Sequence, residues 1–329
     1  MTWDGRVVVV TGAGGFIGSH LVEALAARGA RVRALVHYNS QGSIGALRHV
    51  GPRTLAAIDI IGGDVRDPYT VRSLVRGAHS VFHLAALIGI PYSYVAPASY
   101  VATNVGGTLN ILEAARGEGL ERVVVASTSE TYGTAQYTPI NEAHPAVAQS
   151  PYEATKVGAD QLALSYHRTF DTPVCVVRPF NTFGPRQSER ALIPTIVAQA
   201  LRASGPLQLG SLEPRRDFTY VADTVAGFLV LADRQEAVGR GLNVGSGTAY
   251  TVREVVDVVG RILGRELRVV QDPLRVRPKQ SEVMELCADA SVARSLGWKP
   301  QVSFEDGVRR VVEFMQTVPR DEPATGYRV

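Results

Sequence analysis

Short apolar runs alternate with longer stretches of helical spacing along the first half of the chain. Val7–Val10 is a continuous β-branched run, which is typical of a strand covered on both faces. The sequence predicts further strands at 32–36, 58–62, 81–84, 122–126 and 174–178, and helices at 16–28, 71–75, 100–116 and 152–170. Because strands and helices alternate, the pattern predicts an α/β fold with a Rossmann-type, doubly wound parallel sheet.

The alternation changes after Pro179. A polar loop at 181–190 precedes predicted helices at 192–202, 223–231 and 252–263 and short strands at 207–209 and 267–270. We expect a Rossmann domain over residues 1–178 with a return segment at about 217–244. Residues 179–216 and 245–318 are expected to form a smaller α/β substrate-binding domain, and 319–329 a loose tail.

Composition excludes several classes of protein. The 329 residues carry 34 Lys and Arg against 31 Asp and Glu, and this net charge of +3 does not favour a nucleic-acid partner. Two cysteines, Cys175 and Cys287, are too few for a disulfide scaffold or a Cys-based zinc site, and both lie in apolar runs that predict burial. No histidines have metal-ligand spacing, so we expect no metal. We expect a cytoplasmic protein without a membrane partner, because no apolar stretch reaches about 20 residues and the start lacks a signal-peptide layout.

A glycine-rich turn follows the first predicted strand and opens the first predicted helix. Its glycines have the spacing G-x-x-G-x-x-G, and such a turn lets the backbone and a helix N-terminus meet a pyrophosphate. We therefore expect a dinucleotide cofactor, NAD or NADP, against Gly12, Gly15, Phe16, Ile17 and Gly18.

The end of the second strand does not decide between the two cofactors. Residues 37–40 contain no acid for a ribose 2′-hydroxyl and no Arg for a 2′-phosphate, although His37, Asn39 and Ser40 could contact one. Asp64, followed by Val65, is placed where an acid could meet the adenine amino group. A turn-forming acid at the strand end is the alternative for Asp64.

Tyr152 and Lys156 form a Y-x-x-x-K pair on a predicted helix. Residues i and i+4 share one helix face, so both side chains can point at one nicotinamide ribose. We expect the Lys156 cation to lower the pKa of Tyr152, so that the phenol can act as a base. Chance placement of 12 tyrosines and three lysines gives only about 0.1 such pairs.

Together these motifs resemble the extended short-chain dehydrogenase/reductase family of nucleotide-sugar epimerases and dehydratases. The resemblance covers nearly the whole chain through TGAGGFIG, GDVRD, HLAA, TNVGGTLN, STSETYG, YEATK, RPFNTFGP and RRDFTYV. It implies an enzyme in which Thr128 and Tyr152 handle the C4 hydroxyl of the sugar and hydride moves to the nicotinamide. It also implies a homodimer through the helices near 100–116 and 152–170. Further cofactor contacts are expected at Leu84, Ala85 and Ala86, and substrate contacts at Leu87, Tyr94, Thr128, Asn181, Arg186, Arg216 and Arg277.

Thr128-Ser129-Glu130 bears on the sugar chemistry. Glu130 could remove the C5 proton once C4 is a ketone, whereas simple 4-epimerases carry small residues there. The same three residues occur in GDP-mannose 4,6-dehydratases and in UDP-glucuronate decarboxylases. Longer segments, such as ALIGIPYSY and SPYEATKVGADQLA, look most like legionaminate-pathway 4,6-dehydratases acting on nucleotide-linked N-acetylglucosamine.

We therefore expect a lyase, a 4,6-dehydratase of GDP- or UDP-N-acetylglucosamine. Ser129 stands where dTDP-glucose dehydratases have Asp, so the proton donor to the C6 hydroxyl is left open between Glu130 and a water held by Ser129. A UDP-glucuronate decarboxylase or a nucleotide-sugar 4-epimerase is the alternative. A non-catalytic NAD(P)-binding regulator is the alternative from another class.

Overall fold

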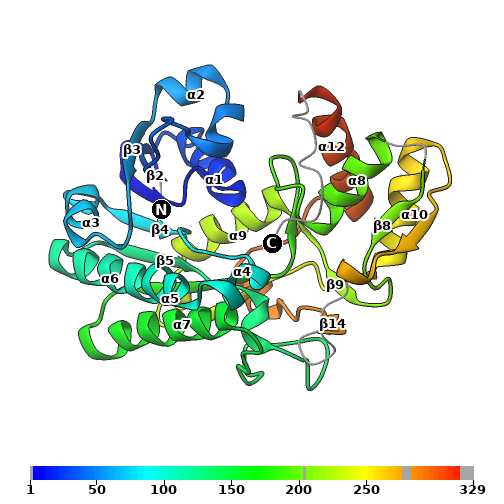
Figure 1. Ribbon diagram of the computed structural model, residues 1–329. Helices are drawn as coiled ribbons and strands as arrows, with labels where there is room; N and C mark the ends of the chain where they lie inside the picture. The colour runs from blue at the N-terminus through cyan, green and yellow to red at the C-terminus, as the bar shows by residue number, and fades with distance from the viewer. Residues whose placement is uncertain (1–2, 203–204, 276–282, 319–329) are drawn as a thin grey trace.

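Seven parallel strands form the central sheet of the protein in a computed structural model that describes residues 3–202, 205–275 and 283–318 (Figure 1). The strand order is β11-β6-β5-β4-β1-β2-β3. Their bounds are β1 (Val7–Thr11), β2 (Arg31–His37), β3 (Asp59–Gly63), β4 (Ser80–His83), β5 (Arg122–Ala126), β6 (Val174–Pro179) and β11 (Gly241–Val244). The sheet confirms the predicted Rossmann-type α/β fold class.

Helices cover both faces of this sheet. Alternate side chains of a strand point to opposite faces, so Val8 and Val10 pack in one hydrophobic cluster and Val9 in another. The first cluster includes residues of α1 (Phe16–Ala26) and α9 (Val221–Asp233). The second includes residues of α3 (Pro68–Val75), α6 (Gly107–Glu118) and α7 (Pro151–Phe170), which lie side by side in Figure 1.

Residues after Pro179 build a second group of elements beside the sheet (Figure 1). Three helices, α8 (Leu192–Arg202), α10 (Val252–Leu263) and α12 (Phe304–Thr317), pack against one another. The short strands pair as β10 (Thr219–Tyr220) with β7 (Thr182–Phe183), β13 (Val269–Gln271) with β8 (Leu207–Leu209), and β9 (Arg215–Asp217) with both β12 (Ala249–Thr251) and β14 (Glu285–Leu286). Helix α11 (Ser291–Ser295) precedes α12. The chain returns to the large sheet through α9 and β11, but the predicted domain boundaries stay a prediction.

The helix expected at 100–116 differs in the structure. It consists of α5 (Pro97–Tyr100), a π-helical turn at Val101–Gly106 and then α6. The π turn widens the helix where Asn104 makes hydrogen bonds outside it, and such turns recur at functional sites. Within the described ranges, the remaining helical segments are α2 (Pro52–Ala56), α4 (Ile90–Val95) and four 3₁₀ turns at 45–49, 129–132, 235–237 and 273–275.

Three smaller expectations can be compared with the structure. Cys175 is buried as predicted, whereas Cys287 is only half-buried because it lies beside the short edge strand β14. The predicted tail at 319–329 lies outside the described residues. Among the residues that are described, no helix is long and apolar enough to cross a bilayer.

Candidate active site at the carboxyl ends of the strands

The glycine-rich turn lies at the point where the strand order reverses. Strand β1 pairs with β2 on one side and β4 on the other, and ligands of doubly wound sheets bind in the crevice at this point. Gly12 has a φ of 66°, and a Cβ there would lie 2.7 Å from the backbone nitrogen of Ala85. Position 12 therefore requires glycine for two reasons: its positive φ, and the close approach of the segment after β4.

The start of α1 suits a pyrophosphate. Gly15 is its N-cap residue and offers no side-chain cap, and a Cβ on Gly18 would collide with the Gly12 carbonyl. Because the residues before the helix are small, the backbone N–H groups of Phe16 and Ile17 in its first turn are open to a ligand. The helix dipole stabilises an anion at this end. This cradle fits a dinucleotide cofactor.

The loop after β2 folds back over the glycine-rich turn, since the backbone N–H of Ala46 donates to the Gly14 carbonyl at 2.8 Å. Asn39 uses its amide inside this loop: Nδ2 donates to the Ser43 carbonyl at 2.9 Å, and Oδ1 accepts from the Ser43 N–H at 2.9 Å. Of the three predicted 2′-phosphate contacts, Asn39 therefore shapes the loop, whereas His37 and Ser40 are exposed at its surface.

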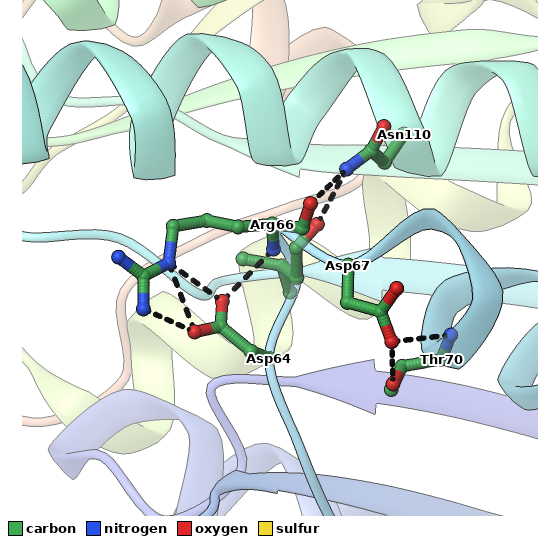
Figure 2. Close-up of polar contacts among 6 residues, drawn as sticks. Asp64, Arg66, Asp67, Thr70 and Asn110 are labelled. Atoms are coloured by element: carbon green, nitrogen blue, oxygen red, sulfur yellow. Dashed lines mark hydrogen bonds and ion pairs between the residues drawn. The ribbon is translucent and has the colours of Figure 1, made fainter.

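Asp64 has a partner that the sequence pattern did not indicate. Figure 2 shows its carboxylate facing the guanidinium of Arg66, with Arg66 Nε 3.0 and 2.9 Å from the two carboxylate oxygens. This pairing lowers the pKa of Asp64. Asn110 of α6 fixes the same segment by donating to the carbonyls of Val65 and Arg66 at 2.9 and 3.0 Å. Contact of Asp64 with adenine stays a prediction, and the described carboxylate is shared with Arg66.

A fully buried histidine connects the glycine-rich turn to α6. His83, at the end of β4, lies with Nδ1 2.8 Å from Thr11 Oγ1 and Nε2 3.2 Å from Thr108 Oγ1. Thr108 donates its own proton to the Asn104 carbonyl, so it accepts from Nε2–H, and Thr11 must donate to Nδ1. Burial holds the ring neutral and lowers the pKa of His83 to about 3.

Replacing His83 with Gln should reduce the acid sensitivity of the fold. Between about pH 6.5 and 3, His83 is protonated in the unfolded chain but neutral in the folded chain. The residue therefore makes the free energy of unfolding fall as pH falls. One such proton is worth about 1.4 kcal/mol per pH unit. Urea unfolding from pH 6.5 to 4 should therefore show a shallower slope in H83Q than in the wild type. Equal slopes would show that His83 is protonated in the folded protein.

Tyr152 and Lys156 share one face near the start of α7, as predicted. Both side chains are buried, with 7% and 6% exposure, and Lys156 Nζ donates to the Ala126 carbonyl at the end of β5 at 2.6 Å. Burial lowers the pKa of Lys156, and the nearby Asp160 carboxylate raises it. The expected lowering of the Tyr152 pKa is wrong for this arrangement: burial raises it, and a hydrogen bond with Thr128 counteracts this only in part.

The 3₁₀ turn Ser129–Tyr132 presents Thr128 and Glu130 to Tyr152. Thr128 is its N-cap residue, and its Oγ1 accepts from the Glu130 N–H at 3.2 Å, which leaves the Thr128 proton for Tyr152. Glu130 lies close enough for its charge to raise the pKa of Tyr152. Its Oε2 is buried and has no hydrogen-bond partner among the described residues, a costly state for a carboxylate oxygen. Ser129, the first residue of the turn, is buried.

The predicted substrate contacts differ in their surroundings. Asn181, after β6, has a buried Nδ2 without a hydrogen-bond partner in the described part of the chain, which suits an anionic oxygen. Arg186 instead makes an ion pair with Glu23 of α1 at 2.7 Å and donates to the His49 carbonyl. Arg216 of β9 is nearly buried and donates to the Arg215 carbonyl at 3.0 Å. Arg277 lies outside the described residues.

Asn104 is the main site residue that the sequence reasoning missed. It is buried in the π turn, and its amide pairs with both the N–H and the carbonyl of Leu87, at 2.8 and 3.0 Å. Nδ2 also donates to Thr155 Oγ1 at 3.0 Å, and Thr155 donates to the Tyr152 carbonyl. The segment TNVGGTLN carried the signal, but only its place in the fold shows that Asn104 joins Leu87 to α7.

A comparison with known families agrees with this geometry. The sequence profile described as GDP-mannose 4,6 dehydratase matches residues 9–311. The chain belongs to this family of NAD-dependent epimerases and dehydratases. The family is NAD(P)-dependent, which confirms the predicted cofactor class.

Relatives within the family catalyse different reactions. The chain is 31% identical to the dTDP-glucose 4,6-dehydratase DesIV of Streptomyces venezuelae, solved with NAD bound, with a TM-score of 0.84 and coverage of 94% of this chain and 97% of that one. It is 28% identical to the UDP-N-acetylglucosamine 4-epimerase of Methanobrevibacter ruminantium, solved with UDP-N-acetylmuramic acid (TM-score 0.85, coverage 95% and 99%). It is 30% identical to UDP-glucuronic acid decarboxylase 1 of Arabidopsis thaliana, over 97% of this chain and 72% of the relative. This family membership establishes an enzyme of nucleotide-sugar chemistry.

Proposed function

We propose that the protein is a nucleotide-sugar 4,6-dehydratase that holds NAD or NADP and acts on GDP- or UDP-N-acetylglucosamine. The observation that carries the proposal is the buried Oε2 of Glu130 beside Tyr152, which has no hydrogen-bond partner in the part of the chain that the structure describes. An epimerase needs no carboxylate at this place, whereas a dehydratase needs a base at C5 of the sugar. A carboxylate oxygen that has no partner among the described residues is suited to meet one in the substrate.

In the proposed reaction, the ionised form of Tyr152 removes the proton of the C4 hydroxyl, and Thr128 donates a hydrogen bond to the phenolate oxygen. The bound nicotinamide supplies a hydride acceptor at C4 and later a hydride donor at C6. The C4 ketone acidifies C5, from which Glu130 takes a proton as hydroxide leaves C6. That hydroxide takes a proton from Glu130 or from a water on Ser129 and leaves as water. When the hydride returns to C6, C5 takes up a proton from solvent and Tyr152 releases the C4 proton to solvent. The overall change is therefore loss of one water with no net redox change.

Contacts with the rest of the substrate follow from the placement of the polar side chains. We infer that the Asn181 amide and Arg216 bind the diphosphate, since an amide N–H and a guanidinium both donate to phosphate oxygens. Leu87 and Tyr94 are proposed to shape the sugar pocket, with Tyr94 48% exposed on α4. The epimerase solved with UDP-N-acetylmuramic acid supports an N-acetylated sugar. A homodimer through α6 and α7 is proposed from the family resemblance.

The alternative within the family is decarboxylation of a UDP-uronate, which relatives of similar identity carry out. It uses the same three residues at 128–130 but also needs a cation for the C6 carboxylate. A 4-epimerase is the second alternative. A non-catalytic regulator would have no use for the buried Tyr152 and Lys156 pair.

Incubation of the protein with single nucleotide sugars in deuterated water, followed by mass spectrometry, tests the proposal. The panel contains GDP- and UDP-N-acetylglucosamine, GDP-mannose, dTDP-glucose and UDP-glucuronate. We expect loss of water with one deuterium gained at C5 from an N-acetylglucosamine nucleotide. Loss of carbon dioxide from the uronate, or isomerisation without loss of mass, would show that the dehydratase assignment is wrong.

A further inference from the structure

The segment 87–95 is tied to the catalytic helix through α5 and the π turn. Asn104 fixes its first residue, Leu87, as described above. The other end forms α4, whose N-cap residue Gly89 has no side chain to cap the helix. Ile88, Tyr92 and Tyr94 are 69%, 43% and 48% exposed, so the segment presents large apolar side chains on the surface next to the candidate site.

Tyr100 makes the second tie. It is 1% exposed, and its hydroxyl donates to the Gly89 carbonyl at 2.5 Å. Its ring meets the Tyr152 ring edge-on, with centroids 6.3 Å apart and an interplanar angle of 78°. On the other side the Tyr92 ring lies 6.1 Å away. One buried side chain thus contacts both the candidate base and the start of α4.

These contacts separate two roles within a single residue. The hydroxyl holds the backbone of the 87–95 segment at Gly89, whereas the ring packs against the rings of Tyr152 and Tyr92. Aromatic pairs in this edge-on arrangement attract each other beyond their buried area, so the Tyr152 ring has a preferred position.

We propose that Tyr100 is a positioning residue that sets the sugar subsite by anchoring Gly89 and α4 against the ring of Tyr152. This inference rests on the proposed role of Tyr152 as the base at C4, a step that dehydratases, decarboxylases and 4-epimerases share. It does not depend on which of the three reactions follows.

Tyr100→Phe tests the anchor, because it keeps the ring and removes only the hydroxyl. Using the sugar nucleotide that the wild type consumes, we expect KM to rise about tenfold and kcat to fall less than threefold. The dissociation constants of NAD⁺ and of the matching free nucleoside diphosphate should stay within about twofold, since neither contains the sugar. Tyr100→Leu, which also removes the ring, should lower kcat by about a hundredfold.

Tyr166→Phe is the matched control, because Tyr166 of α7 also loses a hydroxyl bonded elsewhere, to Glu113 of α6. It should leave KM and kcat unchanged. The proposal is overturned if the two Phe variants behave alike, or if KM and the nucleoside diphosphate dissociation constant rise together. If the wild type consumes none of the sugar nucleotides, which would count against the proposed function, calorimetry of UDP-N-acetylglucosamine against UDP replaces KM with the same expected split.

Discussion

Glu130→Gln should yield a protein that still oxidises the sugar at C4 but releases no dehydrated product. The substitution keeps the size of the side chain and breaks no hydrogen bond of Oε2 within the described residues. Tyr152, Thr128 and Lys156 remain, so substrate should still reduce the nicotinamide, within about tenfold of the wild-type rate. Elimination should fall by about 10²- to 10⁴-fold, the range for loss of a general base.

Stopped-flow absorbance of the reduced nicotinamide, read beside mass spectrometry of the product, separates these two steps. Glu121→Gln is the control, since Glu121 is an exposed partner of Arg6 at 2.6 Å. It should leave both steps unchanged. Elimination at the wild-type rate in E130Q would show that another group removes the C5 proton.

Tyr152→Phe is expected to abolish both steps together. The ring stays, with its edge-on contact to Tyr100, but no group remains to take the C4 hydroxyl proton. Turnover should fall by about 10²- to 10⁴-fold, and the absorbance of reduced nicotinamide should not rise on mixing with substrate. In the wild-type enzyme, burial raises the pKa of Tyr152, so the ionised fraction of the phenol grows with pH. Wild-type activity should therefore increase with pH through the neutral range.

The nicotinamide content of purified Y152F measures whether the variant still holds the cofactor. A wild-type content would show that the variant has lost only the base. Tyr137→Phe provides a matched control, because that hydroxyl is exposed and bonds to Asn141 at 2.9 Å. If substrate reduced the cofactor of Y152F at the normal rate, a residue other than Tyr152 would have to be the base.

Local patterns made the fold and much of the candidate site predictable. Tyr152 and Lys156 are one helical turn apart, and the glycine-rich turn is contiguous, so neither needs knowledge of distant contacts. The prediction of a continuous helix at 100–116 was wrong for the opposite reason. The π turn accompanies hydrogen bonds of Asn104 with Leu87 and Thr155, which are far away in sequence. The Arg186–Glu23 pair likewise joins segments that only the folded chain brings together.

The pKa of Tyr152 shows a second limit. Helical spacing correctly places Lys156 on the same face, but it says nothing about burial, and burial decides the direction of the shift. Asp64 illustrates the same point. Arg66 is only two residues away, but the sequence does not show which side-chain conformation brings its guanidinium to the Asp64 carboxylate.

The seventh strand has a consequence for how the protein is made. Strand β6 ends at Pro179 and pairs with β5 on one side, but its other neighbour, β11, begins only at Gly241. During synthesis, the N–H and carbonyl groups on that side of β6 stay unpaired until Val244 has left the ribosome. Unpaired strand edges recruit other chains. A nascent or truncated chain that stops near residue 180 is therefore expected to aggregate or to require a chaperone.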